Sequence, residues 1–149
     1  MKKNIFITGS AGFIGFSLAK SLLDRGHRIH GYDGMTKYYD VRLKRERNKI
    51  LKTYKNFSFT KAMLENENTL KKAITKFKPK IIIHLAAQPG VRYSIEKPRT
   101  YLSSNITGTF NIIESAHKAK VNHLILASSS SVYGANTHIP YSEIDKTQT

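Results

Sequence analysis

The sequence has 149 residues, a length that allows one domain with a substantial core and is too short for two domains of ordinary size. It contains no cysteine, which excludes disulfide bonds and thiolate chemistry, and no apolar stretch is long enough for a membrane span or the core of a signal peptide. The formal net charge is +15, but the basic residues are scattered, so we expect a cytoplasmic protein with neither a membrane nor a nucleic-acid partner.

The first predicted strand, residues 4–8, leads directly into a glycine-rich turn and a helix. The turn reads Thr-Gly-Ser-Ala-Gly-Phe-Ile-Gly over residues 8–15. Gly9 permits a tight turn, Gly12 lets the backbone approach a pyrophosphate, and Gly15 lets the new helix pack closely. A strand, three glycines and a helix N-terminus in this order predict a loop that binds a dinucleotide.

The second predicted strand, residues 28–33, ends in an acidic residue. The carboxylate of Asp33 can accept hydrogen bonds from both ribose hydroxyls of an adenosine, and its charge would repel a 2′-phosphate. This residue therefore favours NAD over NADP as the dinucleotide. An aspartate that only caps a turn beside Gly34 is the alternative.

Strands and helices alternate through the rest of the chain. A basic amphipathic helix over residues 42–55 is interpreted as a solvated face, with nucleic-acid binding or the steering of anionic ligands as alternatives. The other predicted elements are a helix over 12–25, a strand over 57–60, a helix over 68–77, a strand over 80–85, a helix over 98–119 and a strand over 123–128. This alternation predicts an α/β fold: one Rossmann-like domain, residues 1–149, with a doubly wound parallel sheet of about five strands.

The loops at the carboxyl ends of the strands are the expected ligand crevice. Ala86 and Ala87 suit a close approach to a cofactor, or else helix packing, and the serines at 128–131 are either a substrate contact or a polar loop. We expect His84 to be a hydrogen-bonded core residue, and the other histidines lack metal-ligand spacing, so no metal site is predicted. Tyr133 is disfavoured as a catalytic base because no lysine follows it at short range.

Several of these segments together resemble a known family. The broader likeness is carried by residues 8–15, 84–88, 104–109 and 127–134, and a narrower one by residues 37–44 and 88–98. They are similar to the extended branch of the short-chain dehydrogenase/reductase superfamily, the NAD-dependent epimerase/dehydratase family, and within it the UDP-glucuronate 4-epimerases. The likeness covers essentially the whole sequence.

The resemblance implies a cofactor site at matching positions. These positions are Gly9, Gly12, Phe13, Ile14, Gly15, Asp33, Gly34, Met35, Leu64, Leu85, Ala86, Ala87, Gln88 and Ser104. Ser129 matches the catalytic Ser/Thr that hydrogen-bonds the sugar 4-oxygen. Arg92 is a candidate for contacting an acidic sugar or its diphosphate, with an arginine exposed at a helix end as the alternative. Met63 stands where relatives usually place an aspartate against the adenine, which puts that contact in doubt.

The implied function is NAD-dependent epimerisation at carbon 4 of a UDP-sugar. The alternatives are another nucleotide-sugar epimerase, a dehydratase, a decarboxylase or a non-catalytic dinucleotide-binding module. In the family, a Tyr-x-x-x-Lys pair downstream of the Ser129 position supplies the base, and that pair lies outside these 149 residues. The resemblance therefore implies an N-terminal half that is inactive alone and lacks the substrate domain. We also expect the strand over 123–128 to be an exposed edge through which the chain self-associates.

Overall fold

The computed structural model describes residues 2–135, 139–145 and 147. In this part of the chain, five strands form one sheet in the order β3-β2-β1-β4-β5, and every neighbouring pair is parallel. The strands are β1 (Asn4–Thr8), β2 (Arg28–Asp33), β3 (Phe57–Lys61), β4 (Ile81–His84) and β5 (His123–Leu126). In the centre, Ile5 lies opposite Ile29 of β2 and Ile81 of β4. This order is that of a doubly wound Rossmann-like sheet, so the predicted fold class is confirmed.

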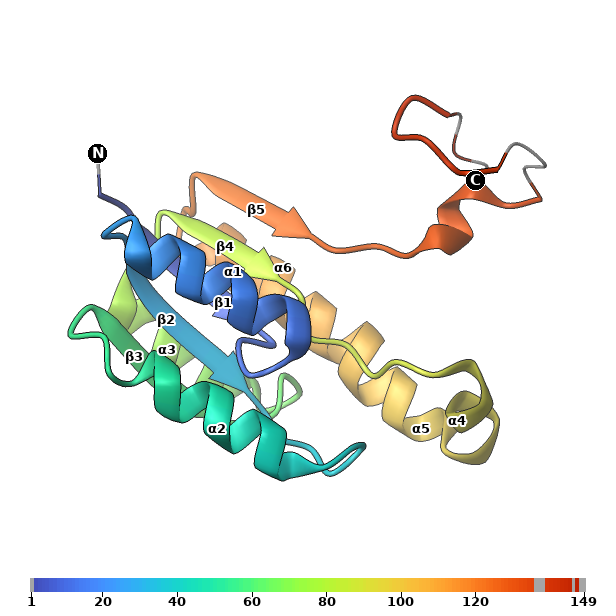
Figure 1. The fold of residues 1–149 in the computed structure, drawn as a ribbon, viewed down its shortest axis with the longest axis horizontal. Helices are drawn as coiled ribbons and strands as arrows, with labels where there is room; N and C mark the ends of the chain where they lie inside the picture. Colours follow the sequence, from blue (N-terminus) through green and yellow to red (C-terminus); the bar gives the residue numbers. More distant parts are fainter. Residues whose placement is uncertain (1, 136–138, 146, 148–149) are drawn as a thin grey trace.

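Helices cover both faces of the sheet (Figure 1). One face carries α1 (Phe13–Asp24) and α2 (Val41–Leu51), and the other carries α3 (Glu67–Phe77) and α6 (Gly108–Lys118). Each helix follows a strand, so the chain crosses the sheet between parallel neighbours and brings all the strand ends to the same edge.

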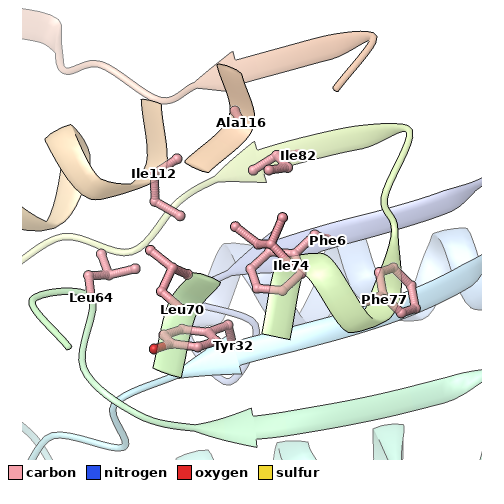
Figure 2. Packing of buried hydrophobic residues seen from close by; sticks show 9 residues of the cluster. All are labelled: Phe6, Tyr32, Leu64, Leu70, Ile74, Phe77, Ile82, Ile112 and Ala116. Carbon is pink, nitrogen blue, oxygen red and sulfur yellow. The ribbon is translucent and has the colours of Figure 1, made fainter. Parts of the chain in front are cut away.

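The core between the sheet and helices α3 and α6 is shown in Figure 2. Its buried members are Phe6, Tyr32, Leu64, Leu70, Ile74, Phe77, Ile82, Ile112 and Ala116. Leu70 and Ile74 lie one helical turn apart on α3 and are fully buried, which contributes roughly 2 kcal/mol each to the free energy of unfolding. Asn66 caps the start of α3, where its side chain accepts a hydrogen bond from the Thr69 amide. Lys78, which follows the last residue of the helix, adopts the left-handed conformation.

The opposite face has a second core against α1 and α2. Ile5, Ile7 and Ile29 of the sheet pack there with Leu23 of α1 and Leu51 of α2. The central strand β1 therefore buries alternate side chains on both faces. Burial on both faces is typical of a parallel sheet that is covered by helices on each side.

The structure departs from the predicted elements in its second half. The helix expected over residues 98–119 is divided into α5 (Pro98–Tyr101), a π-helical segment η1 (Leu102–Thr107) and α6. A short helix that the pattern did not predict, α4 (Val91–Glu96), precedes it. Its apolar residues Val91 and Ile95 lie one turn apart but are exposed, and the helix is too short for its pattern to stand out in the sequence. Strand β5 ends at Leu126, before the predicted Ser128.

Strand β5 occupies one edge of the sheet in the described part of the chain. Beyond it, the chain runs away from the sheet to a 3₁₀ turn, η2 (Ser130–Tyr133) (Figure 1). None of the helices in the described ranges has both the length and the apolar character that crossing a membrane requires.

Candidate functional site

A pocket of about 540 Å³ lies at the carboxyl ends of the strands. Its walls come from the turn after β1, the end of β2 and the loop after β4. Strands β1 and β4 are neighbours in the sheet, and the chain connects outward from them in opposite directions. Doubly wound sheets bind ligands at this kind of switch point.

The glycine turn has the geometry that its sequence predicts. Gly9 has a φ of +70°, a left-handed conformation that favours glycine, and its amide donates to the carbonyl oxygen of Tyr32 at 2.7 Å. A Cβ at Gly9 would lie 2.9 Å from the amide nitrogen of Ala86. A Cβ at Gly15 would overlap the carbonyl oxygen of Gly9. Both glycines therefore allow helix α1 and the loop after β4 to approach the turn.

The N-terminus of α1 opens into this pocket without a side-chain cap. Gly12 is the N-cap residue and offers no side chain to the first turn of the helix. The first-turn residues Phe13, Ile14 and Gly15 line the pocket. Free amide groups and the positive end of the helix dipole suit a phosphate group at this position.

Asp33, at the end of β2, is 4% exposed and accepts three hydrogen bonds. Its Oδ2 accepts from the Ala11 amide at 3.2 Å, and its Oδ1 accepts from the Met35 amide at 2.7 Å. The third donor is the ammonium group of Lys44, 3.0 Å from Oδ1, whose side chain is 11% exposed. The carboxylate is thus fixed at the pocket wall by both the glycine turn and α2.

A hydrogen-bond network behind the glycine turn joins β1, β4 and α6. The Thr8 hydroxyl accepts from the amides of Leu85 and Ala86, each at 3.1 Å, and lies 2.8 Å from Nδ1 of His84. The hydroxyl proton is then available to Nδ1, so we assign the neutral tautomer in which Nε2 donates to Thr109 Oγ1 at 3.0 Å. Burial lowers the pKa of His84 to about 4, and the expected core role of this histidine agrees with these contacts.

The π-helical segment η1 holds the loop after β4. The side chain of Asn105 accepts from the Gln88 amide at 2.7 Å and donates to the Gln88 carbonyl oxygen at 3.1 Å. Ser104, its neighbour, is buried and lines the pocket. Segments of π-helix often occur beside functional sites, and this one contributes directly to the pocket wall.

The structure brings most of the sequence-predicted site residues to this pocket. Those that line it are Gly9, Gly12, Phe13, Ile14, Gly15, Asp33, Gly34, Leu64, Leu85, Ala86, Ala87, Gln88 and Ser104. Met35 does not line the pocket but contacts Asp33 through its amide. Arg92 is exposed on α4 and Ser129 is exposed at the start of η2, both outside the lining.

The sequence reasoning missed the contribution of α2 and the segment before it. The additional lining residues there are Tyr38, Tyr39, Leu43, Lys44 and Arg47. Interpreting the whole basic helix as a solvated face was wrong for Lys44, which is buried against Asp33. Lys44, Asn48 and the core residue Leu51 lie on the same buried face of α2, but a lysine and an asparagine at these positions are not an apolar pattern that would have indicated burial.

The described residues contain no group of three or more histidine, cysteine, aspartate or glutamate side chains that could hold a metal ion.

The chain is similar in sequence to part of several nucleotide-sugar epimerases. A probable UDP-glucuronate 4-epimerase of Rhizobium meliloti is 51% identical over 140 residues, which are 94% of this chain and 41% of that protein. UDP-glucuronate 4-epimerase 2 of Arabidopsis thaliana is 40% identical over 145 residues, 97% of this chain and 33% of that protein. The chain thus spans less than half the length of these two relatives.

Solved structures show the same fold. A UDP-glucuronic acid 4-epimerase variant of Bacillus cereus, in complex with UDP-4-deoxy-4-fluoro-glucuronic acid and NAD, has a TM-score of 0.83 at 30% identity. The match covers 97% of this chain and 46% of that one. A UDP-glucose 4-epimerase of Stenotrophomonas maltophila, with bound NAD and formylated UDP-arabinopyranose, has a TM-score of 0.82 at 27% identity, covering 98% and 43%.

The model of one protein family matches residues 6–149, almost the whole chain. This match agrees with the sheet order, the glycine turn and the relatives. The chain belongs to the GDP-mannose 4,6 dehydratase family, one of the NAD-dependent epimerases and dehydratases.

Proposed function

We propose that this chain is the NAD-binding part of a nucleotide-sugar 4-epimerase that acts on a UDP-sugar, UDP-glucuronate. The observation that carries the proposal is one pocket that unites the glycine turn, the uncapped start of α1 and the Asp33 carboxylate. The relatives named as UDP-glucuronate 4-epimerases support the reaction and the sugar. The solved structures that contain NAD support the cofactor.

The residues present fit a dinucleotide because the turn is compact. A Cβ at Gly9 would meet the backbone of Ala86, and a Cβ at Gly15 would meet the backbone of Gly9, so only glycine at both positions lets the turn, α1 and the loop after β4 form one pocket. The first-turn amides of α1 would face the pyrophosphate, and Asp33 would face the adenosine ribose. When bound, NAD supplies a hydride acceptor for carbon 4 of the sugar. The other proposed cofactor contacts are Gly12, Phe13, Ile14, Gly34, Met35, Leu64, Leu85, Ala86, Ala87, Gln88 and Ser104.

Two exposed residues are proposed for the sugar nucleotide. Ser129 would donate to the sugar 4-oxygen, and its proximity to Ala127, which lines the pocket, supports this role. Arg92 would contact the sugar carboxylate or the diphosphate, and its exposed position on α4 leaves its guanidinium accessible. A UDP-sugar partner and a cytoplasmic location remain predictions.

Calorimetry with NAD tests the proposed pocket. Ala87 is exposed and lines the pocket, so Ala87→Phe should fill the site without disturbing the core and weaken NAD binding at least about tenfold, the equivalent of 1.4 kcal/mol. Ala119, exposed at the end of α6 and outside the lining, provides the matched Ala119→Phe control. Absence of binding by the unmodified chain, or equal losses in both variants, contradicts the proposal.

A dehydratase is the second candidate, because the family that matches this chain is named after GDP-mannose 4,6 dehydratase. The chain alone is expected to form no product, because the family's Tyr-x-x-x-Lys pair is not among these residues. Incubation of a longer protein that contains this sequence and that pair, with NAD and UDP-glucuronate or GDP-mannose, separates the candidates by product mass. Epimerisation leaves the mass of the sugar nucleotide unchanged, whereas dehydration removes one water. Binding of NAD by that longer protein without any product supports a dinucleotide-binding module.

A further inference from the structure

The charge of Asp33 is already compensated inside the protein. A free carboxylate at this position would discriminate strongly against a 2′-phosphate. Here the ammonium group of Lys44 lies 3.0 Å from Oδ1, and both side chains are almost completely buried. The repulsion expected from Asp33 alone is therefore reduced by a neighbouring positive charge that the same pocket contains.

The hydrogen-bonding capacity of Asp33 is largely occupied as well. A carboxylate oxygen offers two lone-pair positions, and Oδ1 uses both for the Met35 amide and the Lys44 ammonium. Oδ2 uses one for the Ala11 amide and keeps one. Two ribose hydroxyls therefore cannot both bind Asp33 directly while Lys44 stays in place, so a ligand at this position also meets the ammonium group of Lys44.

A second cation follows on the same face of α2. Arg47 lines the pocket, and its Nη1 lies 3.3 Å from the Tyr39 hydroxyl and 3.4 Å from the Ala11 carbonyl oxygen. The guanidinium carbon is 6.0 Å from the centre of the Phe13 ring. Within the described ranges, no carboxylate pairs with Arg47. This end of the pocket thus holds one carboxylate and two cations.

We propose that Lys44 and Arg47 set the dinucleotide selectivity of this pocket, so that it accepts a 2′-phosphorylated dinucleotide as well as NAD. The proposal rests on the proposed function, because it assumes that the adenosine end of a dinucleotide lies at Asp33. Guanidinium and ammonium groups both bind phosphate, and the guanidinium can do so with two parallel hydrogen bonds. The α2 cations thereby offset the discrimination that Asp33 would impose alone.

Calorimetric titration with NAD and with NADP tests the inference through the ratio of the two dissociation constants. For the unmodified chain, we expect NADP to bind within about tenfold of NAD. Lys44→Met should raise the NADP-to-NAD ratio at least about tenfold, because it removes a phosphate donor and exposes the charge of Asp33. Arg47→Met should raise the ratio while leaving Asp33 paired. Lys44→Arg, which keeps the cation, should preserve a low ratio.

Lys49→Met is the matched control, because it removes one lysine charge from an exposed position on the same helix. Its ratio should equal that of the unmodified chain. Circular dichroism checks the fold of each variant, and Arg47→Met and Lys44→Arg still test the inference if Lys44→Met does not fold. NAD binding with a ratio that Lys44 and Arg47 do not change overturns the inference alone. Binding of neither dinucleotide overturns the proposed function, and the inference with it.

Discussion

His30 and His84 are buried imidazoles that should make the protein sensitive to acid. Burial lowers the pKa of each to about 4, and Lys76 and Arg28 add to the effect at His30. An unfolded histidine has a pKa near 6.5, so the unfolded chain binds more protons between these values. The free energy of unfolding should be highest above about pH 6.5 and fall by roughly 3 kcal/mol per histidine as the pH approaches 4. Urea titrations across this range measure the loss.

Variants that replace each histidine with a residue that does not titrate show which histidine causes the pH dependence. His84→Asn and His30→Gln should each reduce the slope of the unfolding free energy against pH. His117→Gln, at an exposed position on α6, should leave the slope unchanged. A double variant, His30→Gln with His84→Asn, that retains the full slope would show that other groups cause the acid sensitivity.

Gly15 is a residue at which a single methyl group should matter. A Cβ there would overlap the carbonyl oxygen of Gly9, which is backbone and cannot rotate away. Gly15→Ala should lower the free energy of unfolding by roughly 2 kcal/mol, despite the higher helix propensity of alanine. Ser17→Ala, exposed on the same helix, should change it by less than about 0.5 kcal/mol. Equal urea midpoints for the two variants would contradict this packing argument.

Among the structural elements, the π-helical segment η1 has a clear mechanical role. Asn105 binds both the amide and the carbonyl group of Gln88, and so fixes the pocket loop to η1. Asn105→Ala should speed hydrogen exchange of the Gln88 amide by about tenfold or more, because the loop loses both bonds. Ser103→Ala is the control, since Ser103 donates only to the helix carbonyls of Arg99 and Thr100. Unchanged exchange at Gln88 would show that the loop is held by other contacts.

Elements with local signals were predictable from the sequence. Strands β1 and β2 have the predicted bounds, because an apolar strand that ends in a glycine turn, and another that ends in an aspartate, are defined by adjacent residues. Helix α2 was harder to orient. Its apolar residues Leu43 and Ile50 are about half exposed, whereas Lys44 is buried. The burial of Lys44 depends on Asp33, a contact between different elements that no local pattern contains.

The same distinction applies to the candidate site. The glycine turn and the loop after β4 are contiguous motifs, so their place at one pocket follows from parallel strand order. The pocket wall formed by Tyr38, Tyr39 and Arg47 depends on contacts between elements, such as those of Arg47 on α2 with Ala11 in the glycine turn and with Tyr39. The sequence pattern does not contain that geometry, on which the proposed dinucleotide selectivity of the pocket depends.

At the scale of the whole molecule, β5 is an unpaired sheet edge in the described part of the chain. Ile125 and Leu126 on this strand are each 43% exposed. Unpaired backbone groups next to apolar side chains form a template for pairing with another strand, so we expect the chain to self-associate through β5. Sedimentation velocity over a concentration series should show a species larger than the monomer that increases with concentration.

Lysine substitution distinguishes the β5 edge from other apolar surface. Ile125→Lys places a charge on the edge and should shift the chain to monomer, as charged residues do on the edge strands of natural sheets. Ile50 on α2 has nearly the same exposure, 44%, and lies away from the edge, so Ile50→Lys adds the same charge without affecting β5. Association should persist in Ile50→Lys. A monomer at every concentration of the unmodified chain, or equal dissociation of both variants, would exclude β5 as the contact.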